Sequence, residues 1–221
     1  MILKGLLCST FAAGLVICAQ QGAGVAWRHL SSQAGDFAAQ NTGKEQTSDA
    51  VLDIDKDGVN DFVITERTAA PAMVWYRRTP RGGDRYSVES GALHIEAGTT
   101  YADIDGDGDL DIVAGGDYKT NEVWWWENPY PNFDPNVAWK RHTIKRSGGT
   151  QHHDLAFGDF FGDGKLELVF WNQGSHALYL AQIPPDPRNA GPWQLTGIYS
   201  YPVDHEPPQR GKAASFKSMN Q

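Results

Sequence analysis

Two short segments of the sequence carry aspartate at alternate positions. Residues 53–61 read DIDKDGVND, and residues 103–111 read DIDGDGDLD. Alternate carboxylates around a glycine turn can converge on one point, and Ca²⁺ prefers a shell of oxygen atoms. The pattern therefore predicts two calcium sites. The expected ligands are Asp53, Asp55, Asp57, the Val59 carbonyl and Asp61 in the first segment, and Asp103, Asp105, Asp107, the Asp109 carbonyl and Asp111 in the second.

Three alternatives to a calcium loop fit these segments less well. An EF-hand needs a bidentate Glu at its twelfth position, where this sequence has Ile64 and Ala114. Mg²⁺ retains more of its waters and demands a stricter octahedron. Asp/Gly turns without metal are the remaining alternative. A third copy at residues 159–167, DFFGDGKLE, has Phe161 and Lys165 at ligand positions, so we expect weak binding there or none.

Histidines and carboxylates recur just ahead of these segments and are the candidates for catalysis. Imidazole and carboxylate groups converging at one mouth of a channel could abstract a proton or hold a second metal. The alternative is that each histidine pairs with its neighbours and is structural. No Ser-His-Asp or Cys-His order is recognisable. The candidate residues are His94 with Glu96, His152 and His153 with Asp154, and His205 with Glu206.

The aspartate segments belong to a repeat with periods of 50 and 56 residues. Each is followed by a short apolar run, then by an aromatic or aliphatic segment, then by a Pro/Gly-rich connection and a last segment that contains Trp or Tyr. We find no helical periodicity between these runs, so each repeat predicts four strands. The expected strands include 62–64, 74–76 and 85–88 in the first repeat, 112–114, 123–126 and 139–142 in the second, and 168–170, 178–180 and 193–196 in the third.

Four antiparallel strands per repeat at this period predict an all-β fold, a β-propeller. Complete blades are expected at about 47–90, 92–146 and 151–200, with the start of a fourth at 204–221. Because closed propellers have typically four to eight blades, the chain is expected to be an incomplete fragment. A closed four-bladed ring is the alternative. Residues 27–30, WRHL, match 139–142, WKRH, and predict a last strand whose own blade is missing.

The first 26 residues predict a secretory signal peptide. Their only charge is Lys4, and an apolar run of 15 residues from Gly5 to Ala19 is short for a membrane span. Both cysteines, Cys8 and Cys18, lie in this leader, so the mature chain would have no disulfides. Loss of Lys4 changes the formal net charge from −8 to −9, which disfavours nucleic acid as a partner and favours cations. We expect a secreted protein, extracellular or periplasmic, with no membrane span in the mature chain.

The segment at 103–116 resembles the FG-GAP, or VCBS-type, repeats of integrin α-chain propellers and of many secreted bacterial and fungal proteins. The resemblance covers most of residues 47–200. It implies a propeller with calcium in the hairpin between the first two strands of a blade. Such folds host both adhesion modules and enzymes. The leader, the paired aspartate loops and the lack of a complete catalytic constellation favour a secreted calcium-binding propeller that acts as a binding or adhesion module for carbohydrate or another extracellular protein. A carbohydrate-active lyase or dehydratase that uses the histidines at the channel mouth is the alternative.

Overall fold

The computed structural model describes residues 25–201, which form twelve strands and no helix. The strands make three four-stranded antiparallel sheets, which we call blades 1, 2 and 3. Blade 1 contains β1 (Gln46–Leu52), β2 (Asp61–Glu66), β3 (Met73–Thr79) and β4 (Gly82–Glu89). Blade 2 contains β5 (Ile95–Ala102), β6 (Asp111–Gly116), β7 (Glu122–Glu127) and β8 (Lys140–Arg146). Blade 3 contains β9 (His152–Gly158), β10 (Glu167–Asn172), β11 (Ala177–Gln182) and β12 (Leu195–Ser200).

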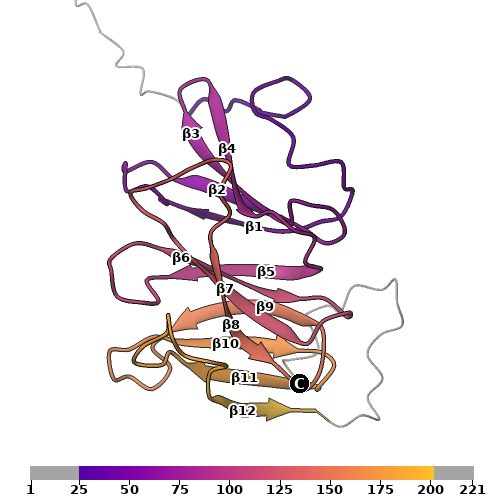
Figure 1. Ribbon diagram of the computed structural model, residues 1–221, viewed down its shortest axis with the longest axis vertical. Coiled ribbons are helices and arrows are strands. Elements are labelled where there is room, and N and C mark those ends of the chain that lie inside the picture. Colours follow the sequence, from indigo (N-terminus) through magenta and orange to yellow (C-terminus); the bar gives the residue numbers. More distant parts are fainter. Residues whose placement is uncertain (1–24, 202–221) are drawn as a thin grey trace, which may run out of the picture.

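Within each blade the strands follow one another in sequence order, as propeller blades do. The blades are stacked along the long axis of the molecule (Figure 1). The first strands of successive blades, β1, β5 and β9, contact one another. The all-β propeller architecture predicted from the repeat is therefore confirmed. His205 and the expected start of a fourth blade at 204–221 lie outside the described residues, as does almost all of the expected signal peptide.

The hydrophobic core consists of two layers between the blades. Ile54, Met73 and Trp75 meet blade 2 in the first layer. In β7, Trp124 and Trp126 face this layer, whereas Trp125 faces the second layer, between blades 2 and 3. Successive side chains of a strand point to opposite faces, so three consecutive tryptophans fill both layers. Most of the tryptophans are buried, and they occupy both layers between the blades.

One backbone bond recurs where each blade meets the next. The N–H of Trp139 donates to the carbonyl of Val88 at 3.1 Å, and the N–H of Trp193 donates to the carbonyl of Ile144 at 2.8 Å. Both indole rings are buried in the layers between blades. The tryptophan that precedes a last strand therefore fixes its blade to the blade before it.

The strand predicted at residues 27–30 does not form. This segment has no regular structure, and Trp27 is 94% exposed. A strand needs a neighbouring strand to satisfy its backbone groups, and WRHL has none within the described residues. Residues 37–41 cover blade 1 instead: the Phe37 ring packs 5.7 Å from Phe62 and 5.2 Å from Tyr76, and Tyr76 donates to the Ala38 carbonyl.

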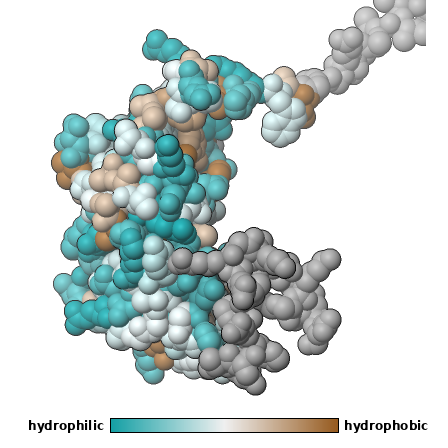
Figure 2. All heavy atoms as spheres, turned by 90° about the vertical axis from the view of Figure 1, so that its right-hand side faces the viewer, coloured by the Kyte–Doolittle hydropathy of each residue, from teal (hydrophilic) through white to brown (hydrophobic). Residues whose placement is uncertain are grey.

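The surface is mainly polar. On the face shown in Figure 2, hydrophobic residues are scattered in small groups among hydrophilic ones. No helix in the part of the chain that the structure describes is long and apolar enough to cross a membrane. The apolar side chains are instead concentrated in the two layers between blades.

Candidate metal centres and a polar cavity

The aspartate segments form the hairpins between the first two strands of each blade, and local hydrogen bonds shape them. In the first loop the Asp53 carboxylate accepts the N–H groups of Asp57, at 3.1 Å, and Gly58, at 2.9 Å. Asp103 accepts from Gly106 and Gly108 in the second loop, and Asp159 accepts from Asp163 and Gly164 in the third. Gly58, Gly108 and Gly164 have φ of 84°, 87° and 82°, which a residue with a side chain rarely adopts.

The first three aspartates converge in the first two loops. Carboxylate oxygens of Asp53, Asp55 and Asp57 all lie within 4.8 Å of one another, and so do those of Asp103, Asp105 and Asp107. Among residues 25–201 these are the acidic or histidine groups dense enough to hold a metal ion; we call them triad 1 and triad 2. The third loop supplies no such group, as expected from Phe161 and Lys165.

Both triads contain buried carboxylate oxygens. The side chain of Asp55 is 3% exposed and that of Asp105 is 2% exposed. Both oxygens of Asp55 and Oδ2 of Asp105 accept no hydrogen bond. A buried ionised group needs a counter-charge, because its hydration is lost and nothing else replaces it.

Arginines supply part of this counter-charge. Arg77, on β3 of the same blade, forms an ion pair with Asp55. Triad 2 is contacted instead from the next blade: Arg188 Nη2 lies 2.7 Å from Asp105 Oδ2 and 2.5 Å from Asp107 Oδ2. Arg188 Nε also donates to Glu127 Oε1 at 3.0 Å. Triad 2 thus joins blades 2 and 3, whereas the arginine that pairs with triad 1 lies in the same blade.

The ninth residue of each loop holds the hairpin to its blade. Asp61 accepts from Trp75 Nε1 at 2.9 Å and from the Arg78 N–H at 2.7 Å. Asp111 is fully buried and accepts the N–H groups of Ile104, at 3.0 Å, and Asn128, at 2.9 Å. Asp61 and Asp111 are not among the three carboxylates that converge in each triad, although the charges of triad members act on both of them. In the third loop Glu167 accepts the Phe160 N–H in the same way.

The seventh residue of each loop, Val59 or Asp109, donates its N–H to the preceding aspartate. Burial is the main cause that raises the pKa of Asp109 to about 7, and the charge of Asp107 adds to it. Burial likewise raises the pKa of Asp111 to about 8. Carboxylates crowded in this way favour protons or cations at the second loop.

Two of the histidines expected to act together, His152 and His153, are adjacent in β9 but have different surroundings. His152 is fully buried: Nδ1 lies 3.0 Å from the Gly116 carbonyl oxygen, and Nε2 lies 3.0 Å from Lys145 Nζ. Burial, with the nearby Lys145 charge, lowers the pKa of His152 to about 4. The adjacent His153 is only partly buried and lies near Glu96, with 4.0 Å between Nε2 and Oε2. His152 and His153 therefore do not share a site.

His153 lines a cavity of about 370 Å³ at the edge of the blades where β1, β5 and β9 begin, opposite the aspartate loops. Each of the three blades contributes two residues to it. They are Glu45 and Arg67 from blade 1, Glu96 and Tyr118 from blade 2, and Gln151 and His153 from blade 3. The cavity therefore lies where the first strands of the three blades come together.

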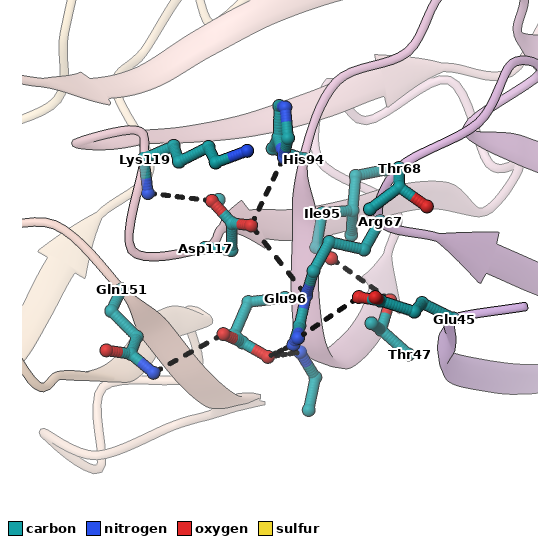
Figure 3. A network of polar contacts seen from close by, with 12 residues as sticks. Glu45, Thr47, Arg67, Thr68, His94, Ile95, Glu96, Asp117, Lys119 and Gln151 are labelled. Carbon is teal, nitrogen blue, oxygen red and sulfur yellow. Dashed lines mark hydrogen bonds and ion pairs between the residues drawn. The ribbon is translucent and has the colours of Figure 1, made fainter. Parts of the chain in front are cut away.

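Arg67 lies at the centre of this cavity (Figure 3). It forms an ion pair with Glu96, while its Nη1 is 3.6 Å from Glu45 Oε2 and its Nε is 3.7 Å from Asp117 Oδ2. Asp117 is buried and lies 3.3 Å from His94 Nδ1. His94 therefore joins the network through Asp117 but does not line the cavity (Figure 3).

A repeated backbone bond explains which residues face the cavity. The N–H groups of Arg67, Asp117 and Gln173, each just after a second strand, donate to the carbonyls of Glu45, His94 and Gln151. His94 thus corresponds to Gln151, and Glu96 corresponds to His153, so His152 is equivalent to Ile95 and not to His94. Sequence reasoning missed Arg67, Asp117 and Gln151. The first two follow the ninth loop residue by six positions, a spacing that could have identified them.

Antiparallel four-stranded blades, each with an aspartate-containing hairpin between its first two strands, define a repeat protein of the β-propeller class. A family model described as FG-GAP-like repeat matches residues 53–114 and 103–170, which together exceed half of the chain. The chain therefore belongs to the FG-GAP-like repeat family. No curated protein matches the sequence.

Proposed function

We propose that this protein is a calcium-binding β-propeller module that binds or adheres to an extracellular ligand. The observation that carries the proposal is the convergence of three carboxylates in each of two hairpins. The family supports a repeat of this kind, and the oxygen-only donor set suits a hard cation.

The residues fit Ca²⁺ on two further grounds. Asp55 Oδ1 is buried and accepts no hydrogen bond, so a cation would satisfy it, and Oδ2 of Asp105 is contacted by the guanidinium of Arg188, whose charge a metal ion would replace. The loops are closed by backbone N–H groups that donate to the carboxylates of Asp53 and Asp103, so these carboxylates are positioned before any ion arrives. Asp53, Asp55 and Asp57 would hold one ion, and Asp103, Asp105 and Asp107 a second. Asp61 and Asp111 would act chiefly by fixing the loops.

Isothermal titration of the mature chain with CaCl₂ tests the proposal. We expect two calcium ions per chain and a melting temperature that rises with calcium and falls with EDTA. An ion that binds only the folded state stabilises it by about 2.7 kcal/mol at a concentration 100 times Kd. MgCl₂ at the same concentration should stabilise less. Absence of both heat and stabilisation with calcium would refute the metal assignment.

Arg188 should weaken calcium binding at triad 2, because its guanidinium already neutralises Asp105 and Asp107. Arg188→Gln is expected to tighten calcium binding there by roughly tenfold while lowering stability in EDTA. Arg77→Gln should do the same at triad 1. Competition with a fluorescent chelator measures both affinities. Lys140→Gln is the matched control. Lys140 also pairs with Glu127, at 3.4 Å, but it forms no ion pair with either triad. Equal effects of Arg188→Gln and Lys140→Gln would contradict this role.

Export fits the same proposal. The signal peptide expected at 1–26 would deliver a chain without cysteine to a compartment rich in calcium. Two bound ions would then fix hairpins that other secreted proteins fix with disulfides. This explains why acidic residues are concentrated in loops that would otherwise repel themselves.

The alternative function, a carbohydrate-active lyase or dehydratase, is favoured by one observation. His153 stands near the buried carboxylate of Glu96 inside a cavity, which is an arrangement that could move a proton. Of the four histidines expected to act together, His152 is buried elsewhere and His94 pairs with Asp117. The binding module is therefore the better supported proposal.

A further inference from the structure

We propose that the cavity lined by Glu45, Arg67, Glu96, Tyr118, Gln151 and His153 binds a neutral saccharide. The inference names a ligand for the binding module proposed above, and it uses none of the calcium-binding residues. At about 370 Å³ the cavity lies within the usual size range of small-molecule sites.

The cavity has a fixed polar wall. Glu96 is 2% exposed. Its Oε1 accepts the N–H of Ala97 at 3.0 Å and also forms the ion pair with Arg67. Gln151 Nε2 reaches Glu96 Oε2 at 3.5 Å and His153 Nε2 at 3.4 Å, both long contacts. Donors and acceptors that are positioned but only loosely paired can exchange these contacts for those of a ligand at little cost.

The backbone at this edge is also unusual. His94 and Gln151, at equivalent positions before β5 and β9, have φ of 58° and 64°. Residues with side chains rarely adopt this conformation, and it is concentrated at functional sites. The carbonyl of each is held by the N–H of the residue that follows the second strand, so the conformation is imposed by the blade.

The charge pattern selects the class of ligand. An anion would approach Glu45 and Glu96, and a cation would approach the guanidinium of Arg67 (Figure 3). The carboxylates repel an anion, and a cation would have to displace the guanidinium of Arg67, which already pairs with Glu45 and Glu96. An uncharged ligand avoids this repulsion, provided that it hydrogen-bonds to both kinds of group. Hydroxyl groups both donate and accept, so a polyhydroxylated ring satisfies carboxylate, amide and guanidinium together.

Tyr118 completes the match to a sugar ring. It lines the cavity and is 46% exposed. Lys119 Nζ lies 5.6 Å from the centroid of its ring. An aromatic side chain with an apolar face and a polar tip is suited to a ligand that is itself apolar on one face and polar at its edge. The cavity thus offers both kinds of contact that a saccharide needs.

The test is titration of the full chain, saturated with calcium, with three sugars that share the glucose ring and differ in charge. They are methyl glucoside, glucuronic acid and glucosamine. The galactose series and the disaccharides lactose and maltose are titrated in parallel, with binding followed by saturation-transfer NMR. We expect neutral sugars to bind weakly, with Kd of about millimolar for a single ring, and both charged analogues to bind at least tenfold more weakly.

Tyr118→Ala and Gln151→Ala should each weaken binding of the neutral sugar at least fivefold. Tyr130→Ala is the matched control, because Tyr130 is also partly exposed and has a lysine over its ring, Lys56 at 4.6 Å, but lies away from the cavity. Calcium stoichiometry should be unchanged in Tyr118→Ala, so failure of the saccharide site is distinguishable from failure of the calcium sites. Binding of no neutral sugar, tighter binding of a charged analogue, or an equal loss in Tyr130→Ala would overturn the proposal.

Discussion

Asp57→Ala and Asp107→Ala are each expected to remove one of the two calcium sites, with affinity at that loop falling at least about a hundredfold. Each substitution deletes one of three carboxylates that converge within 4.8 Å, and calcium affinity depends steeply on the number of charged ligands. Calorimetry should report one ion per chain for either variant and none for the double variant. The calcium-dependent rise in melting temperature should shrink in the same order.

Asp163→Ala is the matched control for these two variants. Asp163 occupies the same loop position, and its carboxylate accepts the N–H two residues ahead at 3.0 Å, as Asp57 does at 2.8 Å and Asp107 at 3.2 Å. All three substitutions therefore remove the same turn bond, and only two remove a triad member. Similar losses of stability in EDTA, but different calcium stoichiometries, are expected. If Asp163→Ala also abolished calcium binding, the triads would not be the sites.

The blades were predictable because their signals are local. An apolar run after each aspartate loop gives the second strand, and WWW at 124–126 predicts side chains on both faces of a buried strand, as found. The strand expected at 27–30 does not form, because strand pairing depends on a partner elsewhere in the fold and is not a local signal. Its sequence matches a last strand, but pairing requires a partner strand, which sequence similarity alone does not provide.

The cavity could not be predicted fully because bulges in the first strands decide which residues face it. The pairing of β9 with β10 shifts register between His153 and Leu155, where Asp154 has φ of 47°. β5 is irregular over the equivalent stretch between Ile95 and Thr99. Adjacent residues of a strand point to opposite faces, so of His152 and His153 only one can face the cavity. A one-residue shift moves every side chain beyond it to the other face, so the bulge at Asp154 decides which of the two it is.

The role of the ninth loop residue was also beyond sequence reasoning. A metal ligand and a hairpin clamp both require a carboxylate, so Asp61 and Asp111 fit either role. The difference lies in the donors around them, Trp75 and Arg78 in one loop and Ile104 and Asn128 in the other. These donors come from other strands and connections, and their approach is a property of the folded blade.

His152 should make the folded state sensitive to acid. Its Nδ1 faces the Gly116 carbonyl and so carries the proton, which leaves Nε2 to accept from Lys145 Nζ at 3.0 Å. Lys145 also donates to the carbonyls of Asn121 and Gly149, so it cannot turn away without losing these bonds. Protonation of His152 would place two buried cations in contact. Burial already lowers the pKa of Lys145 to about 8.

The sign of the pH effect follows from the two states. Between pH about 4 and 6.5 the unfolded chain binds a proton at His152 and the folded chain does not, so unfolding becomes easier as the pH falls through this window. The contribution is up to about 3 kcal/mol, because one pKa unit corresponds to about 1.4 kcal/mol. Asp109 and Asp111, whose pKa values are raised, act in the opposite direction as the pH falls. The difference between the wild type and a His152 variant isolates the histidine.

Urea unfolding of the wild type and His152→Gln at pH 7, 5.5 and 4.5 in EDTA measures this difference. At pH 7 the variant should be less stable by about 1–3 kcal/mol, because the amide cannot replace both ring contacts. At pH 4.5 the two proteins should be much closer in stability, since the wild type alone has lost the contribution of a neutral imidazole. His94→Gln, the same substitution at a partly exposed histidine, is the control for replacing an imidazole by an amide. A constant difference between wild type and His152→Gln at all three pH values would show that His152 does not have to be neutral in the folded protein.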